Sequence, residues 1–168
     1  SHLPPGVVGI GVDLVDTARF ATVVRRTPSI VTRVFTPDEV AACGGDRLRT
    51  DSLAARWAAK EAVAKVLVDT GGLEWHDCQV VGGDHGQPHL LMRGSVELAA
   101  RARGIDTWHV SLSHDGGMAI AFVVAARVVG ERRRARRHAP RVRHPLDDRP
   151  RRRGERGARH VEAGRRGP

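Results

Sequence analysis

The hydrophobic pattern of the chain opens with a short apolar segment, residues 7–15, that contains two glycines. An apolar run of this length predicts a buried strand, here one that ends at Asp13. Side chains alternate between the two faces of a strand, so Gly9, Gly11 and Asp13 share one face and the larger apolar residues share the other. We therefore expect the Asp13 carboxylate to lie beside a stretch of bare backbone.

The strongest helix signal extends over residues 52–68, with Asp51 or Ser52 as its cap. Its apolar side chains spread almost all the way around the helix, which predicts a largely buried central helix rather than a surface one. A shorter helix is expected at residues 16–26. Another begins in the segment Thr36-Pro37-Asp38-Glu39, which has the Thr, Pro and Glu spacing of a capping box.

The remaining periodic segments predict strand pairs and one more helix. Short apolar runs joined by glycine-containing turns favour hairpins, and a glycine also ends the helix. The expected strands lie at residues 78–81, 90–93, 107–113 and 118–126, and the expected helix lies at residues 96–103. This order of elements predicts an α+β fold class, a compact domain with antiparallel strands around a buried central helix.

Charge divides the chain into two parts. Residues 131–168 contain 15 of the 28 basic residues and 5 of the 19 acidic ones, which leaves the first 130 residues with a net charge of −1. An arginine-rich segment with few apolar residues cannot bury enough surface to fold, so we expect a domain at 1–130 and a disordered tail at 131–168. The tail is either an ordinary solvated segment or an artefact of the coding frame, or it is a segment that attracts RNA or acidic proteins. Nucleic acid is thus expected to bind only through the tail.

The chain has two isolated cysteines, Cys43 and Cys78, without the spacing of a disulfide framework or a zinc site. They are expected to be small core residues of a protein that is kept reduced. No apolar run approaches the ~20 residues that a membrane span requires, and no signal peptide is visible. These features predict a cytoplasmic protein without a membrane partner.

Two carboxylates are candidates for chemistry. Glu61 lies in the mostly apolar central helix, with Trp57 one turn before it and Lys65 one turn after it. A carboxylate in such surroundings needs a partner, because burial of an unpaired charge is costly. The alternative is a simple Glu61–Lys65 pair on an exposed edge of the helix. Asp13 likewise has the alternative of a cap or turn carboxylate.

Four sequence blocks in a fixed order carry more information than either carboxylate alone. They are Gly9-Ile10-Gly11-Val12-Asp13-Leu14-Val15, Val34-Phe35-Thr36-Pro37-Asp38-Glu39, Leu53-Ala54-Ala55-Arg56-Trp57-Ala58-Ala59-Lys60-Glu61-Ala62-Val63-Ala64-Lys65 and Trp108-His109-Val110-Ser111-Leu112-Ser113-His114-Asp115. Together they resemble the bacterial holo-[acyl-carrier-protein] synthase family of 4′-phosphopantetheinyl transferases over residues 7–126. The resemblance implies Mg²⁺-dependent transfer of 4′-phosphopantetheine from coenzyme A to a serine of an acyl carrier protein, with release of 3′,5′-ADP.

The resemblance also implies roles for individual side chains. Asp13 and Glu61 hold the metal, and Mg²⁺ suits such a site because it takes one or two carboxylates together with waters and substrate phosphate oxygens. Glu61, or a water that it orients, is the candidate base for the serine proton. Lys65 is expected to stabilise phosphoryl oxygens in the transition state. Arg56, Lys60 and Lys65 are the expected phosphate contacts of coenzyme A.

The last block contributes Ser111, Ser113 and His114 to the site in this family, with the serines at the coenzyme and His114 among the catalytic residues. His109 is either a site residue or a structural histidine. Asp115 either orients a histidine or starts the turn that follows. These assignments come from the resemblance and remain open for His109 and Asp115.

The resemblance extends to partners. Arg19 matches a position that meets the acidic carrier protein, and an ordinary exposed arginine is the alternative. Family members form homotrimers with sites between subunits, so a neighbouring copy is expected to complete the pocket. At residues 68–73 the chain departs from the family's Gly-Thr-Gly pattern, which puts the adenine contacts in doubt. Whether the carrier protein serves fatty-acid or polyketide synthesis stays open.

Two other function classes compete with this interpretation. An RNA-binding protein with an arginine tail would use aromatic stacking residues, but the chain has only three Phe, three Trp and no Tyr. A catalytically inactive scaffold with the same fold is the other class. Mg²⁺-dependent consumption of coenzyme A distinguishes an enzyme from such a scaffold.

Overall fold

The computed structural model describes residues 5–68, 71–82 and 86–128. The α+β class predicted from the sequence is confirmed, whereas the predicted tail at 131–168 lies outside the described residues. In chain order the elements are β1 (Val7–Asp16), α1 (Thr17–Arg26), α2 (Ser29–Val34), α3 (Pro37–Ala42), η1 (Gly45–Arg47), α4 (Thr50–Leu67), η2 (Trp75–Asp77), β2 (Cys78–Val81), β3 (His89–Met92), α5 (Gly94–Ala102), β4 (Thr107–Asp115) and β5 (Met118–Ala126).

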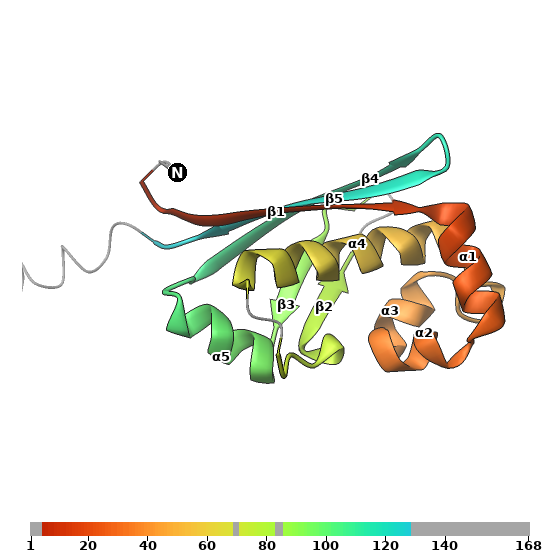
Figure 1. Ribbon diagram of the computed structural model, residues 1–168, viewed down its shortest axis with the longest axis horizontal. Coiled ribbons are helices and arrows are strands. Elements are labelled where there is room, and N and C mark those ends of the chain that lie inside the picture. The colour runs from red at the N-terminus through yellow and green to blue at the C-terminus, as the bar shows by residue number, and fades with distance from the viewer. Residues whose placement is uncertain (1–4, 69–70, 83–85, 129–168) are drawn as a thin grey trace, which may run out of the picture. The chain divides into compact units, whose positions relative to one another are not determined.

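The strands of the described part form two antiparallel sheets. The larger sheet has the strand order β1-β5-β4, and β2 pairs with β3 in the smaller one. Helix α4 runs along one face of the larger sheet, with the β2–β3 pair and α5 on its other side and α1 to α3 at one end (Figure 1). This position between two layers explains why almost all of α4 is buried, as the spread of its apolar residues predicts.

The caps of the helices agree with the sequence at some positions and differ at others. The capping box at Thr36 and Glu39 is confirmed at the start of α3, since each residue bonds the other's backbone N–H. Helix α4 instead begins earlier than predicted, with Arg49 as its N-cap. The Asp51 carboxylate accepts a hydrogen bond from the neighbouring Ser52 N–H and lies inside the first turn. Helix α2 was not predicted.

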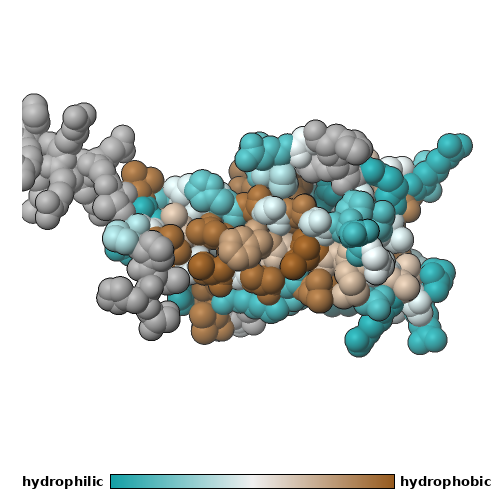
Figure 2. All heavy atoms as spheres, turned by 90° about the horizontal axis from the view of Figure 1, so that it is seen from above, coloured by the Kyte–Doolittle hydropathy of each residue, from teal (hydrophilic) through white to brown (hydrophobic). Residues whose placement is uncertain are grey.

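The prediction that β1 is a buried strand ending at Asp13 is wrong in two respects. The strand continues to Asp16, and its larger apolar residues Ile10, Val12 and Leu14 are 46%, 42% and 58% exposed. Figure 2 looks onto this outer face of the sheet and shows a hydrophobic area along it. The glycine face packs on α4 instead, because a face without side chains lets a helix approach closely.

Both cysteines lie in the core as predicted, and the two do not form a disulfide with each other. Burial raises the pKa of the Cys78 thiol to about 12, so the thiol stays protonated and unreactive at neutral pH. Among the described residues, no helix is both long enough and apolar enough to cross a membrane.

Asp77 ties the start of α5 to the turn before β2. Its Oδ2 accepts hydrogen bonds from the Ser95 backbone N–H at 2.7 Å and from the Ser95 hydroxyl at 2.8 Å. These bonds lower the pKa of Asp77 below its usual value. A carboxyl with a lowered folded-state pKa contributes stability above its unfolded-state pKa, and that contribution is lost as pH falls through the folded-state pKa.

Asp77→Asn is therefore expected to be less stable than the wild type at pH 7, with the difference shrinking as pH falls below about 4. Urea unfolding at neutral pH and at about pH 3 measures both values. Asp46→Asn, at an exposed position, is the matched control and should change little at either pH. Equal stability of Asp77→Asn and wild type at neutral pH would contradict the assigned role.

Candidate active site

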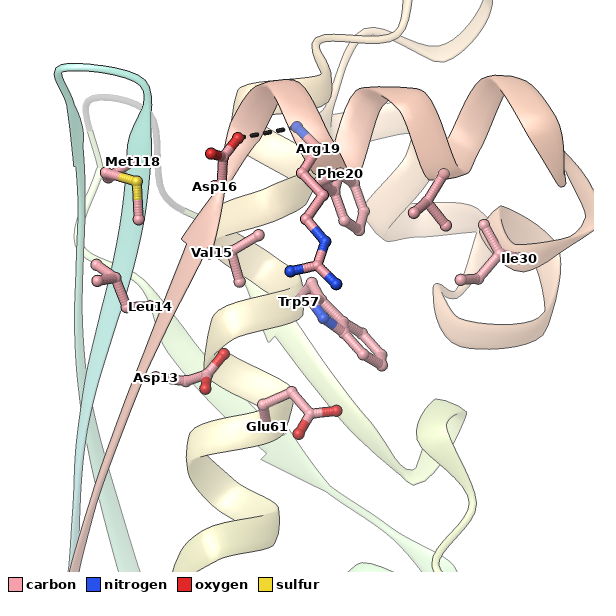
Figure 3. Close-up of a pocket in the computed structure, with 11 residues that line it drawn as sticks. Asp13, Leu14, Val15, Asp16, Arg19, Phe20, Ile30, Trp57, Glu61 and Met118 are labelled. Atoms are coloured by element: carbon pink, nitrogen blue, oxygen red, sulfur yellow. Dashed lines mark hydrogen bonds between the residues drawn. The ribbon is translucent and has the colours of Figure 1, made fainter.

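The structure brings Asp13 and Glu61 together. Asp13 lies on the inner face of β1 and Glu61 on the neighbouring part of α4, and both carboxylates border the same open space (Figure 3). Residues far apart in the sequence meet here because α4 packs lengthwise against β1. The pairing predicted from the sequence is thus present in the geometry of one chain.

Gly11 is the reason that β1 and α4 come so close. A Cβ at Gly11 would overlap the backbone carbonyl oxygen of Ala62, the residue after Glu61. A Cβ at Gly9 would meet only the Val66 side chain, with the nearest methyl 2.9 Å away. The backbone contact at Gly11 therefore sets the separation between the strand that carries Asp13 and the helix that carries Glu61.

Gly11→Ala is expected to destabilise the protein by ~1–3 kcal/mol and to lower its activity, because the added methyl pushes β1 away from α4. Gly9→Ala is the matched control. It adds the same methyl group, but a side chain can move where a carbonyl cannot. Thermal unfolding and activity assays on both variants measure the difference, and equal effects would contradict the close-contact role of Gly11.

Lys65 completes the polar cluster. Its ammonium donates to Asp13 Oδ1 at 2.6 Å and to the Val12 carbonyl oxygen at 2.9 Å, and the Lys65 side chain is 53% exposed. The ion pair of Lys65 is thus with Asp13. The alternative, a simple Glu61–Lys65 ion pair on an exposed edge of the helix, is absent among the described residues. A half-exposed ammonium beside two carboxylates remains accessible to an anion that enters from solvent.

The electrostatics of Glu61 follow from its surroundings. Burial raises the pKa of Glu61, the negative charge of Asp13 raises it further, and Lys65 acts in the opposite direction. Its ionised form is therefore disfavoured in the free protein and would be favoured by a bound cation. A carboxylate with a raised pKa is also a better proton acceptor near neutral pH.

An open cavity of about 540 Å³ adjoins the carboxylates. Arg19 and Trp57 reach over it, and Phe20 and Ile30 line it farther along α1 and α2 (Figure 3). Sequence reasoning identified Arg19 but missed this apolar lining. The apolar positions of α1 are visible in the sequence, whereas the contribution of α2 is not, since that helix was not predicted.

Lys60 and Arg56 do not line this cavity, and their coenzyme contacts stay a prediction. The Lys60 side chain is fully buried, and its ammonium lies 2.9 Å from Glu39 Oε2 and donates to the carbonyls of Trp75 and Cys78. The Arg56 side chain is also buried and donates to the Gly82 carbonyl oxygen at 2.8 Å. Both groups serve internal contacts in this chain because their helix face points away from β1.

The predicted residues of β4 lie apart from Asp13. Ser111 and Ser113 pair with Phe122 and Ile120 of β5, on the exposed outer face of the sheet, while Asp13 pairs with Ala121 on the inner face. Alternation along the strands accounts for this separation. Within one chain, neither serine can therefore reach the cavity beside Asp13.

The remaining predicted residues, His109, His114 and Asp115, also lie on β4. His114 is exposed near the turn, and His109 is exposed on the outer face farther along β4. Asp115 accepts a hydrogen bond from the Gly116 N–H at 2.8 Å, so its carboxylate starts the turn. The turn is tied to α1, since both the N–H and the hydroxyl of Thr17 donate to the Gly117 carbonyl oxygen.

Comparison with known proteins gives one consistent answer. The model of the 4′-phosphopantetheinyl transferase superfamily matches residues 9–123. The chain is 52% identical over 126 residues to the holo-[acyl-carrier-protein] synthase of Kocuria rhizophila, which covers 75% of this chain and 98% of that relative. It is 56% identical over 119 residues to the synthase of Frankia alni, covering 71% and 97% of the two chains.

A solved structure agrees with these relatives. The chain is similar to Helicobacter pylori holo-[acyl-carrier-protein] synthase in complex with coenzyme A, at 28% identity and a TM-score of 0.60 over 70% of this chain and 99% of that one. Asp13, Glu61 and Lys65 all lie within the segment that the family model matches. By its sequence and its fold, the chain belongs to the 4′-phosphopantetheinyl transferase superfamily.

Proposed function

We propose that the chain is a holo-[acyl-carrier-protein] synthase, which transfers 4′-phosphopantetheine from coenzyme A to a serine of an acyl carrier protein and releases 3′,5′-ADP. The observation that carries the proposal is the pair Asp13 and Glu61 with Lys65 beside it, in a chain about half identical to curated synthases over nearly their whole length. An anionic substrate such as a pyrophosphate suits a site that combines carboxylates, an accessible ammonium and an open cavity.

The residues of the site fit a magnesium ion. Among the described residues, no group of three or more His, Cys, Asp or Glu gathers, so the donors here are two carboxylates. Mg²⁺ is bound in this manner, by one or two carboxylates with waters and substrate phosphate oxygens. The raised pKa of Glu61 beside Asp13 also favours a bound cation. Asp13 and Glu61 would hold the ion, which supplies charge neutralisation for the pyrophosphate.

The chain's own residues then have distinct tasks. Glu61 accepts the proton of the carrier serine, directly or through a water, as the serine oxygen attacks the β-phosphate. Lys65 can turn from Asp13 toward the phosphoryl oxygens, because its side chain is half exposed and its ion pair lies near the surface. The bond from the β-phosphorus to the bridging oxygen breaks, and 3′,5′-ADP leaves with that oxygen.

Release of 3′,5′-ADP tests this proposal. The nucleotide should appear only when coenzyme A, Mg²⁺ and an apo carrier protein are all present, and it should be absent with a carrier whose serine is replaced by alanine. Chromatography of the quenched reaction separates 3′,5′-ADP from coenzyme A. Absence of the product with several apo carriers, or its appearance without any carrier, would contradict the proposal.

A homotrimer is part of the proposal, because one chain lacks the β4 residues at its cavity. Ser111 and Ser113 lie on the outer face of the sheet beside Phe122 and Ile120, which are 44% and 40% exposed. Exposed apolar areas of this kind mark interaction surfaces. In the proposed trimer, this face meets a neighbouring copy and brings Ser111 and Ser113 to that copy's Asp13–Glu61 pair, and His114, which pairs with Ala119 on the inner face, would reach that pair from the exposed end of the hairpin.

Phe122→Glu is expected to lower the mass in solution from about three times the chain's 18.2 kDa toward that of one chain, because it buries a charge in the proposed interface. Light scattering after size exclusion measures this mass. Leu98→Glu, at a 71% exposed leucine on α5, is the matched control and should leave the mass unchanged. A Phe122→Glu protein that keeps the wild-type mass would contradict this interface.

The carrier protein and the compartment complete the proposal. Arg19 reaches over the cavity, and Arg25 and Arg26 lie in the last turn of α1, so this helix offers positive charge to an acidic carrier. The carrier is proposed to be that of fatty-acid synthesis. The cytoplasm is the proposed location, and two buried cysteines that form no disulfide with each other are consistent with a reducing compartment.

A further inference from the structure

A fully buried ion pair lies behind the site, on the side of α4 that faces away from β1. Lys60 Nζ lies 2.9 Å from Glu39 Oε2, and both side chains have 0% exposure. The Lys60 ammonium also donates to the carbonyls of Trp75 and Cys78, and it lies 5.7 Å from the centre of the Phe35 ring. The family resemblance implies a coenzyme contact for Lys60, and the chain itself shows an internal ion pair whose presence calls for a physical explanation.

Glu39 connects the pair to the surrounding elements. Its Oε1 accepts the Val80 N–H of β2 at 2.9 Å, and its Oε2 accepts the Thr36 N–H at 2.9 Å. The carboxylate thus joins the start of α3 to β2, and through Lys60 it joins both to the middle of α4. Every one of these bonds is directional, so together they define one orientation of the Lys60 side chain.

Stability alone does not account for such a pair. Moving two charges out of water costs energy that their attraction only partly returns, and apolar residues of similar volume are often equally stable or better. Removal of one partner is costly because it leaves an uncompensated buried charge. In some proteins, a buried polar or charged group is retained because it fixes one specific arrangement of the parts.

Helix α4 is an element that needs such a constraint. The side chains around it are mostly small and buried, including Ala55, Ala58, Ala59, Ala62 and Ala64. Packing of methyl groups is non-directional and restricts rotation of the helix about its axis only weakly. On one side, the Gly11 contact with the Ala62 carbonyl holds the helix against β1. On the other side, Arg56 donates one bond to the Gly82 carbonyl oxygen, and the Lys60 ammonium makes three directional contacts, with Glu39, Trp75 and Cys78.

We propose that the buried Glu39–Lys60 pair is a positioning element that sets the rotation of α4, so that Glu61 faces Asp13. Glu61 lies between Lys60 and Ala62 in the sequence, and both neighbours are held from opposite sides of the helix. A small rotation of α4 would move the Glu61 carboxylate out of line with Asp13. The inference rests on the proposed function, in which these two carboxylates hold a divalent cation.

The test measures cation binding without turnover. Free Mn²⁺ is followed by electron paramagnetic resonance in the presence of coenzyme A, at a temperature where every variant is folded. The main variant, Glu39→Gln with Lys60→Met, removes both charges and keeps both side-chain sizes. Glu39→Asp keeps the charge but shortens the anchor. Ile105→Ala, a core truncation in the turn before β4, is a control for loss of stability alone.

Mn²⁺ binding by the double variant is expected to weaken about tenfold or more, the size of effect that supporting residues have on metal sites. Binding by Glu39→Asp should weaken several-fold, and binding by Ile105→Ala should stay at the wild-type value despite its lower melting temperature. A folded double variant that binds Mn²⁺ within twofold of wild type would overturn the positioning role. If the double variant does not fold, Glu39→Asp is the deciding variant. Mn²⁺ binding by folded Glu39→Asp within twofold of wild type would then overturn the positioning role. Wild-type protein that binds no Mn²⁺ would overturn the metal site itself as well.

Discussion

Glu61→Gln is expected to slow transfer by ~1000-fold, because the amide has neither the charge to hold a cation nor the basicity to accept a proton. Its stability should equal or exceed that of the wild type. Burial and the Asp13 charge raise the pKa of Glu61, so the ionised carboxylate is less favourable in the folded state than in the unfolded one, and a neutral amide relieves this cost. Activity and stability should thus change in different directions.

Single-turnover transfer at saturating Mg²⁺ and thermal unfolding are the two measurements. Glu97→Gln is the matched control, since Glu97 is part of an exposed pair with Arg101 on α5, and it should retain wild-type transfer. Near-normal transfer by Glu61→Gln would remove Glu61 from the mechanism. A large loss of stability would instead show that the carboxylate holds the fold together.

Lys65→Ala is expected to lower kcat by ~100-fold, the effect of losing one preorganised electrostatic donor. If Lys65 only pairs with Asp13, its removal costs less than ~1 kcal/mol of stability and no chemistry, because the Lys65 ammonium is half exposed to solvent. Lys65→Arg should recover only part of the rate, since the guanidinium differs from an ammonium in reach and geometry.

The transfer rate of the Lys65 variants is measured with coenzyme A and carrier protein both saturating, so that weaker substrate binding does not affect the rate. Stability is expected to change little in either case, and only the kinetics distinguish the two roles. A Lys65→Ala enzyme within threefold of wild type would leave Lys65 as a surface ion-pair residue.

The sequence predicts the local features of this fold better than the contacts between elements. The capping box at Thr36 and Glu39 is visible because its members are three residues apart, and both are where they were expected. The second role of Glu39, as partner of Lys60, joins residues 21 positions apart and has no local signature. The buried pair therefore became visible only in the structure.

The faces of β1 illustrate a second limit. Alternation correctly grouped Gly9, Gly11 and Asp13 on one face, but it favoured burial of the larger apolar residues on the other. In the folded chain the glycine face is covered by α4, and the apolar face is exposed. Periodicity separates the two faces of a strand, and it does not state which one a helix covers or which one a second chain would cover.

The sequence predicted the carboxylate pair of the candidate site, but not how the other residues are arranged around that pair. The resemblance named Asp13, Glu61 and Lys65, and the structure brings all three together. Alternation along β4 already places Ser111 and Ser113 opposite Leu112, which packs inward, so their distance from the cavity follows from the sequence once the sheet order is known. That order depends on long-range pairing.

The most direct measurement is the intact mass of an apo acyl carrier protein after incubation with this protein, coenzyme A and Mg²⁺. The mass of the carrier protein is expected to increase by about 340 Da, the mass of one phosphopantetheine arm on one serine. The gain should be absent with Glu61→Gln over the same time and absent with chelator. No gain with the wild-type protein, or an equal gain with Glu61→Gln, would contradict the assignment of transferase activity to the Asp13–Glu61 site.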